Sequence, residues 1–91
     1  MRSIELSRVA WIDLDRLEAW LVDKPYAGDL GNALGDAIMS LREFPERGRH
    51  SSFGELRELI VRFRSWSYVI TYSVTVSSVT IARIHHGFED R

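Results

Sequence analysis

The chain has 91 residues, of which 45% are hydrophobic and 27% are charged, and it contains no cysteine. This is the composition of a folded domain, so it excludes a disordered tail, a disulfide framework, a thiolate zinc site and a cysteine nucleophile. The net charge of −1 disfavours a dedicated nucleic-acid-binding protein, because such proteins carry a clear positive excess. We expect one domain over residues 1–91 in the cytoplasm, since no segment resembles a signal peptide or a membrane span.

The two halves of the chain differ in charge. Residues 1–46 hold five Lys or Arg and nine Asp or Glu, whereas residues 47–91 hold seven Arg and four Asp or Glu. Eleven of the twelve cations are arginine, whose planar guanidinium suits carboxylates across protein interfaces as well as phosphates. The second half therefore fits an acidic protein partner. The alternative is that both halves present solvated faces of opposite sign.

The chain begins with a predicted strand and an amphipathic helix. Residues 2–6 alternate in polarity, as a strand does, and Ser7 is placed to cap a following helix. That helix should end near Asp23, because the residue before Pro25 disfavours helical geometry. Its apolar stripe has 4-3-4 spacing and consists of Ala10, Leu14, Leu17 and Leu21.

A second helix is predicted over residues 26–43, and Pro45 ends it, so that the two helices form a hairpin. Gly28, Gly31 and Gly35 share one face of this helix, and each costs it about 1 kcal/mol relative to alanine. One interpretation is that the first helix or a partner approaches this face closely. The alternative is a weak helix that tertiary packing holds in place.

After a polar loop over residues 46–54, the hydrophobic period changes from that of a helix to that of a strand. Runs rich in β-branched and aromatic residues predict three consecutive strands, over residues 56–63, 68–74 and 79–85. The order β-α-α-β-β-β predicts an α+β fold. In it the helical hairpin packs on one face of a mostly antiparallel twisted sheet, and the other face is at least partly open.

No catalytic or metal-binding motif stands out, so we expect no metal and no cofactor. The chain has no Gly-rich phosphate loop, zinc signature or nucleophile elbow. His85 and His86 are neighbours on a strand, so they point to opposite faces and cannot hold one metal ion together. Asp13 and Asp15 lie two apart on a helix, do not face each other, and are expected to be solvated.

The remaining candidate functional residues are arginines. Arg57, Arg62 and Arg64 lie on or beside the first of the three strands, and Arg83 lies within an apolar run of the last. A cation in such a run must be paired or must point out from the open face of the sheet. Arg83 is therefore either a ligand-facing residue or one that is bonded to a carboxylate or to backbone carbonyls.

The order of several short motifs resembles the RelE/ParE toxin superfamily. The matching segments are residues 55–61 (Glu-Leu-Arg-Glu-Leu-Ile-Val), residues 68–74 (Tyr-Val-Ile-Thr-Tyr-Ser-Val) and residues 79–87, which end in Ile-His-His-Gly. Residues 41–49, which contain Phe-Pro-Glu-Arg-Gly-Arg, and the Asp-Leu pair at residues 13–14 also resemble family patterns. The resemblance covers nearly the whole chain and implies a RelE/ParE-like domain with the same β-α-α-β-β-β order.

Within the superfamily, the chain resembles the ParE branch more than the RelE branch. RelE-like members are ribosome-dependent messenger-RNA nucleases, with basic residues after the tyrosine of the middle strand and after the last strand. Here Val69 follows Tyr68, and Glu89 and Asp90 follow the last strand, where acidic side chains would repel a scissile phosphate. The resemblance thus implies a toxin that poisons DNA gyrase and arrests growth by protein binding, without catalysis of its own.

The resemblance also implies a cognate, ParD-like antitoxin that forms a hetero-oligomer with the toxin. Its C-terminal segment would fold on binding, with a helix near the helical hairpin and sometimes an added strand at the sheet edge. Both helix tryptophans lie beside the core stripe, so the alternative for them is completion of the intramolecular core. The residues expected to contact the antitoxin are Trp11, Trp20, Arg57 and Tyr72.

Contacts with the target are expected from the sheet, without direct binding of nucleic acid. The residues concerned are Arg62, Arg64, Arg83 and His85. Two other functions stay open. One is a ribosome-dependent ribonuclease, whose unusual site would consist of Arg57, Arg62, Arg83 and His85. The other is an inactive family member that binds only its antitoxin.

Overall fold

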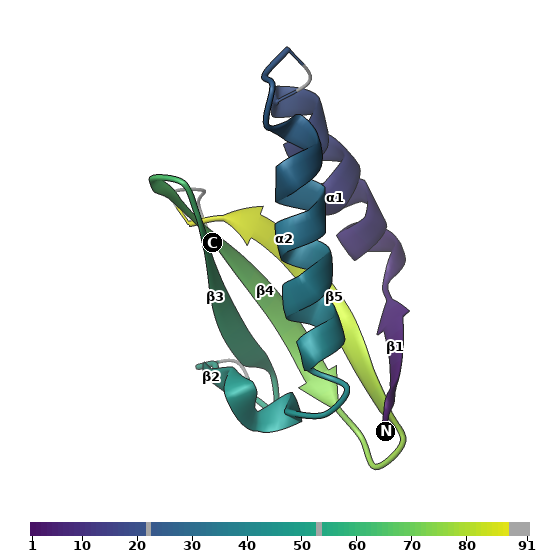
Figure 1. Cartoon of the computed structure of the whole chain (residues 1–91). Coiled ribbons are helices and arrows are strands. Elements are labelled where there is room, and N and C mark those ends of the chain that lie inside the picture. The colour runs from purple at the N-terminus through teal and green to yellow at the C-terminus, as the bar shows by residue number, and fades with distance from the viewer. Residues whose placement is uncertain (22, 53, 88–91) are drawn as a thin grey trace.

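Two helices cover one face of a five-stranded sheet in the computed structural model, which describes residues 1–21, 23–52 and 54–87 (Figure 1). In chain order the elements are β1 (Ser3–Leu6), α1 (Arg8–Trp20), α2 (Ala27–Ser40), the 3₁₀ helix η1 (Pro45–Arg47), β2 (Arg49–His50), β3 (Arg57–Phe63), β4 (Trp66–Val74) and β5 (Ser78–His86). The predicted α+β fold and its helical hairpin are confirmed. No helix in the described ranges is long and apolar enough to span a membrane.

The strands lie in the order β1-β5-β4-β3-β2, so the first and last strands of the chain lie side by side. β1 pairs with β5 in parallel, and the other three pairings are antiparallel. The sequence did not predict β2, because this two-residue strand lies inside the segment taken as a polar loop. It pairs Arg49 with Glu58 and His50 with Arg57, which leaves the outer edge of β3 uncovered beyond Glu58.

The core lies between the helical hairpin and the sheet. Ser7 caps α1 as predicted, since its hydroxyl accepts a hydrogen bond from the Ala10 N–H at 3.0 Å. The same hydroxyl donates to the Ala82 carbonyl at 2.9 Å, which fixes the start of α1 to β5. The largest fully buried side chains are Tyr72, Leu30, Leu34, Leu41, Ile70, Ile81, Ile84, Val69 and Val79.

A β-bulge in β5 changes which side chains face the helices. Thr71 pairs with Arg83 and Tyr72 pairs with Ile81, so Ala82 is left without a partner on β4. The buried positions of β5 therefore switch from Val79 and Ile81 to the even-numbered Ile84 and His86. A regular strand would have placed position 83 on the helix side, whereas the bulge turns Arg83 outward.

Candidate functional site

The carboxylate of Asp13 joins α1 to β5. Arg83 donates to it twice, from Nε to Oδ2 at 2.8 Å and from Nη2 to Oδ1 at 3.2 Å, and the Ile84 N–H donates to Oδ2 at 2.9 Å. Arg16 lies 3.7 Å from Oδ1. The prediction that Asp13 is solvated was wrong, since Asp13 is only 3% exposed. Asp15, by contrast, is exposed.

Asp13 occupies the edge of β5 that β1 leaves open. β1 ends at Leu6, opposite Ile81, so the N–H of Ile84 lies beyond the last residue of that strand and needs another acceptor. Burial alone would raise the pKa of Asp13. The hydrogen bonds from Arg83 and Ile84 and the charges of Arg83 and Arg16 outweigh it and hold the pKa below its ordinary value. Of the two roles considered for Arg83, the structure shows the bonded one.

Tyr72 and Arg57 tie the 3₁₀ turn to the sheet. The Tyr72 hydroxyl donates to the Pro45 carbonyl at 2.7 Å and accepts from the Gly48 N–H at 2.8 Å, and Arg57 donates to the Gly48 carbonyl at 2.7 Å. A Cβ on Gly48 would lie 2.5 Å from the Tyr72 hydroxyl oxygen, so only glycine fits there. Burial raises the pKa of Tyr72, although the Gly48 hydrogen bond and the charge of Arg57 act against the rise.

These hydrogen bonds change the interpretation of Tyr72 and Arg57, two of the residues that were predicted to contact the antitoxin. Tyr72 is fully buried and both hydrogen bonds of its hydroxyl are made within the chain, so it offers a partner no side-chain surface. Arg57 is half-buried, and besides Gly48 it contacts Nε2 of His50 at 3.3 Å. Both residues hold η1 and β2 in place, so the structure gives each of them a role within the chain.

The four residues of the ribonuclease alternative do not share one face of the sheet. Directly paired residues of antiparallel strands point to the same face. Arg57 pairs with the buried Tyr72 and so lies on the helix side, whereas Arg83 pairs with Thr71, and His85 with Val69, on the other side. Arg62 pairs with Ser67 and belongs to the outer side as well. No cluster of three metal-ligating side chains occurs among the residues that the structure describes.

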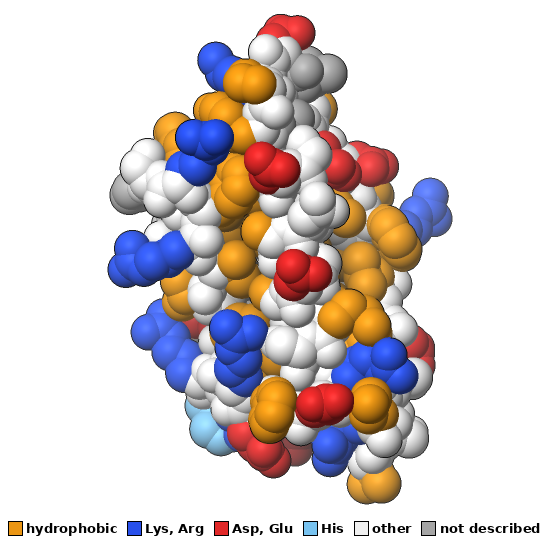
Figure 2. Space-filling view, in the orientation of Figure 1, with side chains coloured by type: hydrophobic (Ala, Val, Ile, Leu, Met, Phe, Trp, Pro, Cys, Tyr) orange, Lys and Arg blue, Asp and Glu red, His pale blue; other side chains and the backbone are white. Residues whose placement is uncertain are grey.

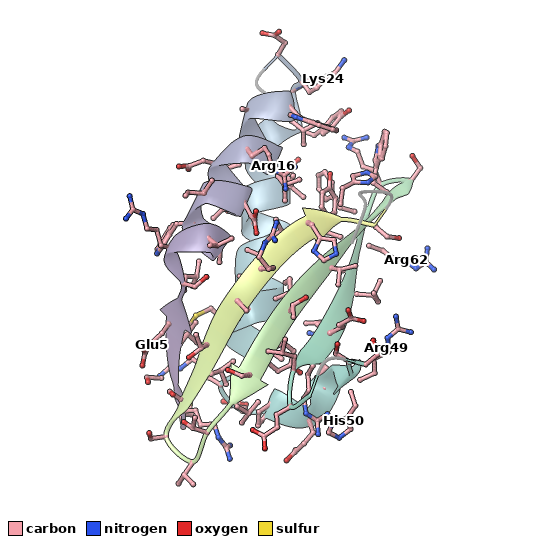
Figure 3. All side chains as sticks on the ribbon, turned by 180° about the vertical axis from the view of Figure 1, so that it is seen from behind. Glu5, Arg16, Lys24, Arg49, His50 and Arg62 are labelled. Atoms are coloured by element: carbon pink, nitrogen blue, oxygen red, sulfur yellow. The ribbon has the colours of Figure 1, made fainter. Side chains whose placement is uncertain are left out.

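Cations line the β3 side of the sheet. Figure 2 shows Lys and Arg side chains spaced along that side, and Figure 3 shows Arg62 and Arg49 projecting from it. Arg64 is exposed in the turn between β3 and β4, where it has a φ of 56°, in the left-handed region. Its guanidinium carbon lies 3.8 Å from the centroid of the Tyr26 ring, a cation–π contact that fixes the side chain against the start of α2.

Trp11 lines an apolar groove of about 230 Å³ between α1, α2 and β1. Its side chain is 56% exposed, so the alternative that it completes the core is excluded. Along α2 the groove exposes two glycines beside apolar side chains: a Cβ on Gly35 would meet nothing within 4 Å, and one on Gly31 would meet only the Glu18 carboxylate at 3.4 Å. The glycine face is therefore open, and the first helix does not pack closely against it. The remaining lining residues are Ile4, Leu6, Leu14, Leu34, Ile38 and Met39.

Trp20 is 66% exposed and lies on the other side of α1. The nine residues that separate it from Trp11 correspond to about two and a half helical turns. Trp20 accordingly lines a different recess, which it shares with Trp66, Tyr68 and His86. The two tryptophans, which were both predicted to contact the antitoxin, therefore line different recesses.

Comparison with known proteins decides the family. Residues 4–91 match the model of the ParE toxin of type II toxin–antitoxin systems, parDE. The chain belongs to the ParE toxin family. It is thus the toxin component of a type II toxin–antitoxin system, as its motifs indicated.

Two relatives of this ParE-family chain are named RelE toxins. It is 43% identical to Toxin RelE1 of Caulobacter vibrioides, over 87% of this chain and 86% of the relative. It is 39% identical to Toxin RelE3 of the same organism, over the full length of both. The fold is that of a chain in the chromosomal ParDE system from P. aeruginosa, with a TM-score of 0.81, 22% identity and coverage of 94% and 96% of the two chains.

The sequence held a signal for Asp13 that we missed. Asp13 lies three residues after Ala10 and four before Leu17, so it shares the core stripe of α1 and had to be buried and paired. Nothing in the sequence indicated its partners, because the Ile84 N–H is available only where β1 ends. Met39 of the Trp11 groove was also missed, since an exposed methionine on a helix gives no signal of its own.

Proposed function

We propose that this ParE-family toxin arrests growth by binding DNA gyrase and has no catalytic activity of its own. The observation that carries the proposal is the bidentate contact of Arg83 with Asp13, which engages this arginine within the fold. Arg57, the other arginine of the ribonuclease alternative with a fixed position, is held on the opposite face. The family resemblance supplies the identity of the target.

Cleavage of RNA needs preorganised cations around the reacting phosphate and a positioned acid and base. Arg83 would have to leave a bidentate contact with a 3% exposed carboxylate to supply such a cation. Leaving Asp13 buried without its partner would cost several kcal/mol. Arg62 and His85 remain on the outer face, and two separated groups do not make a phosphoryl-transfer site.

We further propose that the antitoxin neutralises the toxin by placing an amphipathic helix in the Trp11 groove. The groove is apolar, and its open glycine face on α2 allows the backbone of a partner helix to approach closely. Trp11 and Met39 provide large exposed apolar surfaces, of which a tryptophan is the typical anchor of an interface. Of the two tryptophans predicted to contact the antitoxin, this proposal retains Trp11 and assigns Trp20 to another surface.

Expression of the chain alone, and then with its neighbouring gene, tests the proposal. We expect growth arrest with filamentation and an induced DNA-damage response, relieved by the antitoxin. Arrest with rapid messenger-RNA cleavage would instead favour the ribonuclease, and no arrest would favour an inactive family member. An R62A/H85A variant is the informative addition, because a ribonuclease built on these residues would lose its cleavage of RNA in that variant.

A further inference from the structure

An aromatic recess opens between the end of α1, the start of α2 and the ends of β4 and β5. Its volume is about 230 Å³, and its depth is lined by the aliphatic side chains of Leu17 and Leu21. The other lining side chains are Trp20, Lys24, Tyr26, Trp66, Tyr68 and His86. We call this the aromatic pocket. Every lining residue belongs to the described part of the chain.

Three rings of the pocket pack against one another. The His86 ring packs edge-on between two others, with centroid distances of 4.7 Å to Trp66 and 5.2 Å to Tyr68. His86 is 5% exposed and Tyr68 4%, whereas Trp66 is 44% and Trp20 66% exposed. Two buried rings thus form the floor and two exposed tryptophans the rim. Rigid aromatic surfaces of this kind bind a bulky side chain with little loss of conformational entropy.

The rim of the pocket is cationic. Lys24, labelled in Figure 3 in the loop between the two helices, lines the pocket directly. Arg64 stacks over the ring of the pocket residue Tyr26, with 3.8 Å from its guanidinium carbon to the ring centroid. Asp23, next to Lys24, is exposed as well. Lys24 and Arg64, one lining the pocket and one stacked on its Tyr26 ring, favour a ligand that carries negative charge.

We infer that the aromatic pocket is the surface with which the toxin grips its target, and that it takes an acidic peptide segment carrying one bulky apolar side chain. This inference rests on the proposed function, since it assumes a protein target. The pocket lies on the side of α1 opposite the Trp11 groove, so an antitoxin helix in that groove leaves the pocket's own lining untouched. Toxicity and neutralisation therefore depend on different tryptophans of one helix.

A peptide fits this pocket better than a nucleic acid does. The apolar lining of the pocket suits a leucine or an aromatic side chain. A strand of nucleic acid needs a continuous basic track as well as stacking rings, and the chain as a whole carries a charge of −1. A base stacked between the two tryptophans is the competing occupant, and the experiment below separates the two.

The test compares Trp20→Ala, and separately Lys24→Glu with Arg64→Glu, against Phe44→Ala as a matched control. Phe44 is 61% exposed and lies outside the pocket. Growth arrest, binding to immobilised gyrase, affinity for the antitoxin and binding to a labelled single-stranded oligonucleotide are measured for each. Because Trp20 is largely exposed, its loss should leave the far-UV circular dichroism and the unfolding midpoint unchanged.

We expect Trp20→Ala and the charge-reversed variant each to weaken gyrase binding and toxicity at least tenfold, while antitoxin affinity stays within about threefold of the wild type. Phe44→Ala should behave as the wild type. Unchanged toxicity and gyrase binding in the pocket variants would overturn the inference while leaving the proposed function intact. So would pocket-dependent binding of the oligonucleotide, or an equal loss of antitoxin affinity. A wild-type chain that arrests growth without binding gyrase would refute the proposed target, and the loss of arrest in Trp20→Ala would then still identify the pocket as the toxic surface.

Discussion

The two tryptophans of α1 lie on opposite sides of one helix and belong to surfaces of different chemistry. The Trp11 groove is apolar and bordered by an open glycine face, which suits the backbone of a second helix. The aromatic pocket beside Trp20 is rigid, deep and rimmed by cations, which suits a single anchored side chain on an acidic segment. Under the two proposals above, a chain of this size presents separate surfaces to its antitoxin and to its target. It also makes the docking of α1 on the sheet the feature on which both surfaces depend.

The largest expected effect comes from a substitution that breaks the contact of α1 with the sheet, because both surfaces depend on that contact. Asp13→Asn removes the charge that Arg83 and the Ile84 N–H share, and we expect it to lower the free energy of unfolding by about 3 kcal/mol. Urea denaturation measures the change. The matched control is Asp15→Asn, at an exposed position of the same helix, which should stay within about 0.5 kcal/mol of the wild type. Equal stability of the two variants would show that the Asp13 contacts do not hold α1.

A second change should lower stability at a place distant from both tryptophans. Gly48→Ala puts a methyl group 2.5 Å from the Tyr72 hydroxyl oxygen and 2.9 Å from the Glu58 carbonyl oxygen, and we expect a loss of about 2 kcal/mol. Thermal unfolding measures it, with Gly28→Ala as the control, because a Cβ on Gly28 meets nothing within 4 Å. A neutral Gly48→Ala would contradict the close packing of η1 against β4.

The Trp11 groove can then be separated from the aromatic pocket by one substitution. Trp11→Ala should weaken antitoxin binding at least tenfold, or about 1.4 kcal/mol, because an exposed tryptophan in a groove is a typical interface anchor. Titration calorimetry with the purified antitoxin measures the affinity, and co-expression should no longer relieve growth arrest fully. An affinity equal to that of Phe44→Ala would place the antitoxin elsewhere on the toxin.

The smallest expected effect is a pH dependence of the free energy of unfolding, which tests whether the charge of Asp13 stabilises the fold. Its pKa is lowered in the fold from the ordinary 3.8, so its ionised form stabilises the native state above that pH. The contribution disappears as the pH falls through the lowered pKa, since both states then bind the proton. The stability difference between the wild type and Asp13→Asn should therefore be full near neutrality and shrink below about pH 4. A difference that stays constant with pH would contradict the ionic contact.

Element types and their order were predictable because each has a strong local pattern. The capping Ser7, the stripe of α1 and the alternating strands agree with the structure to within a few residues. β2 and the bulge at Ala82 were not predictable, since a two-residue strand and an unpaired residue depend on their neighbours in the sheet. The same holds for the sites: helical spacing placed Trp11 and Trp20 beside the core stripe but left open whether they are exposed, and their assignment to two recesses depends on where β1, β4 and β5 end.

The most direct test of the central proposal uses the purified toxin with gyrase and supercoiled plasmid, and in parallel with ribosomes translating a defined transcript. We predict that DNA cleaved and covalently bound by gyrase accumulates in proportion to the toxin, while the transcript stays intact. Cleavage of the transcript in the ribosomal A site, abolished in R62A/H85A and without accumulation of cleaved plasmid, would contradict the proposal.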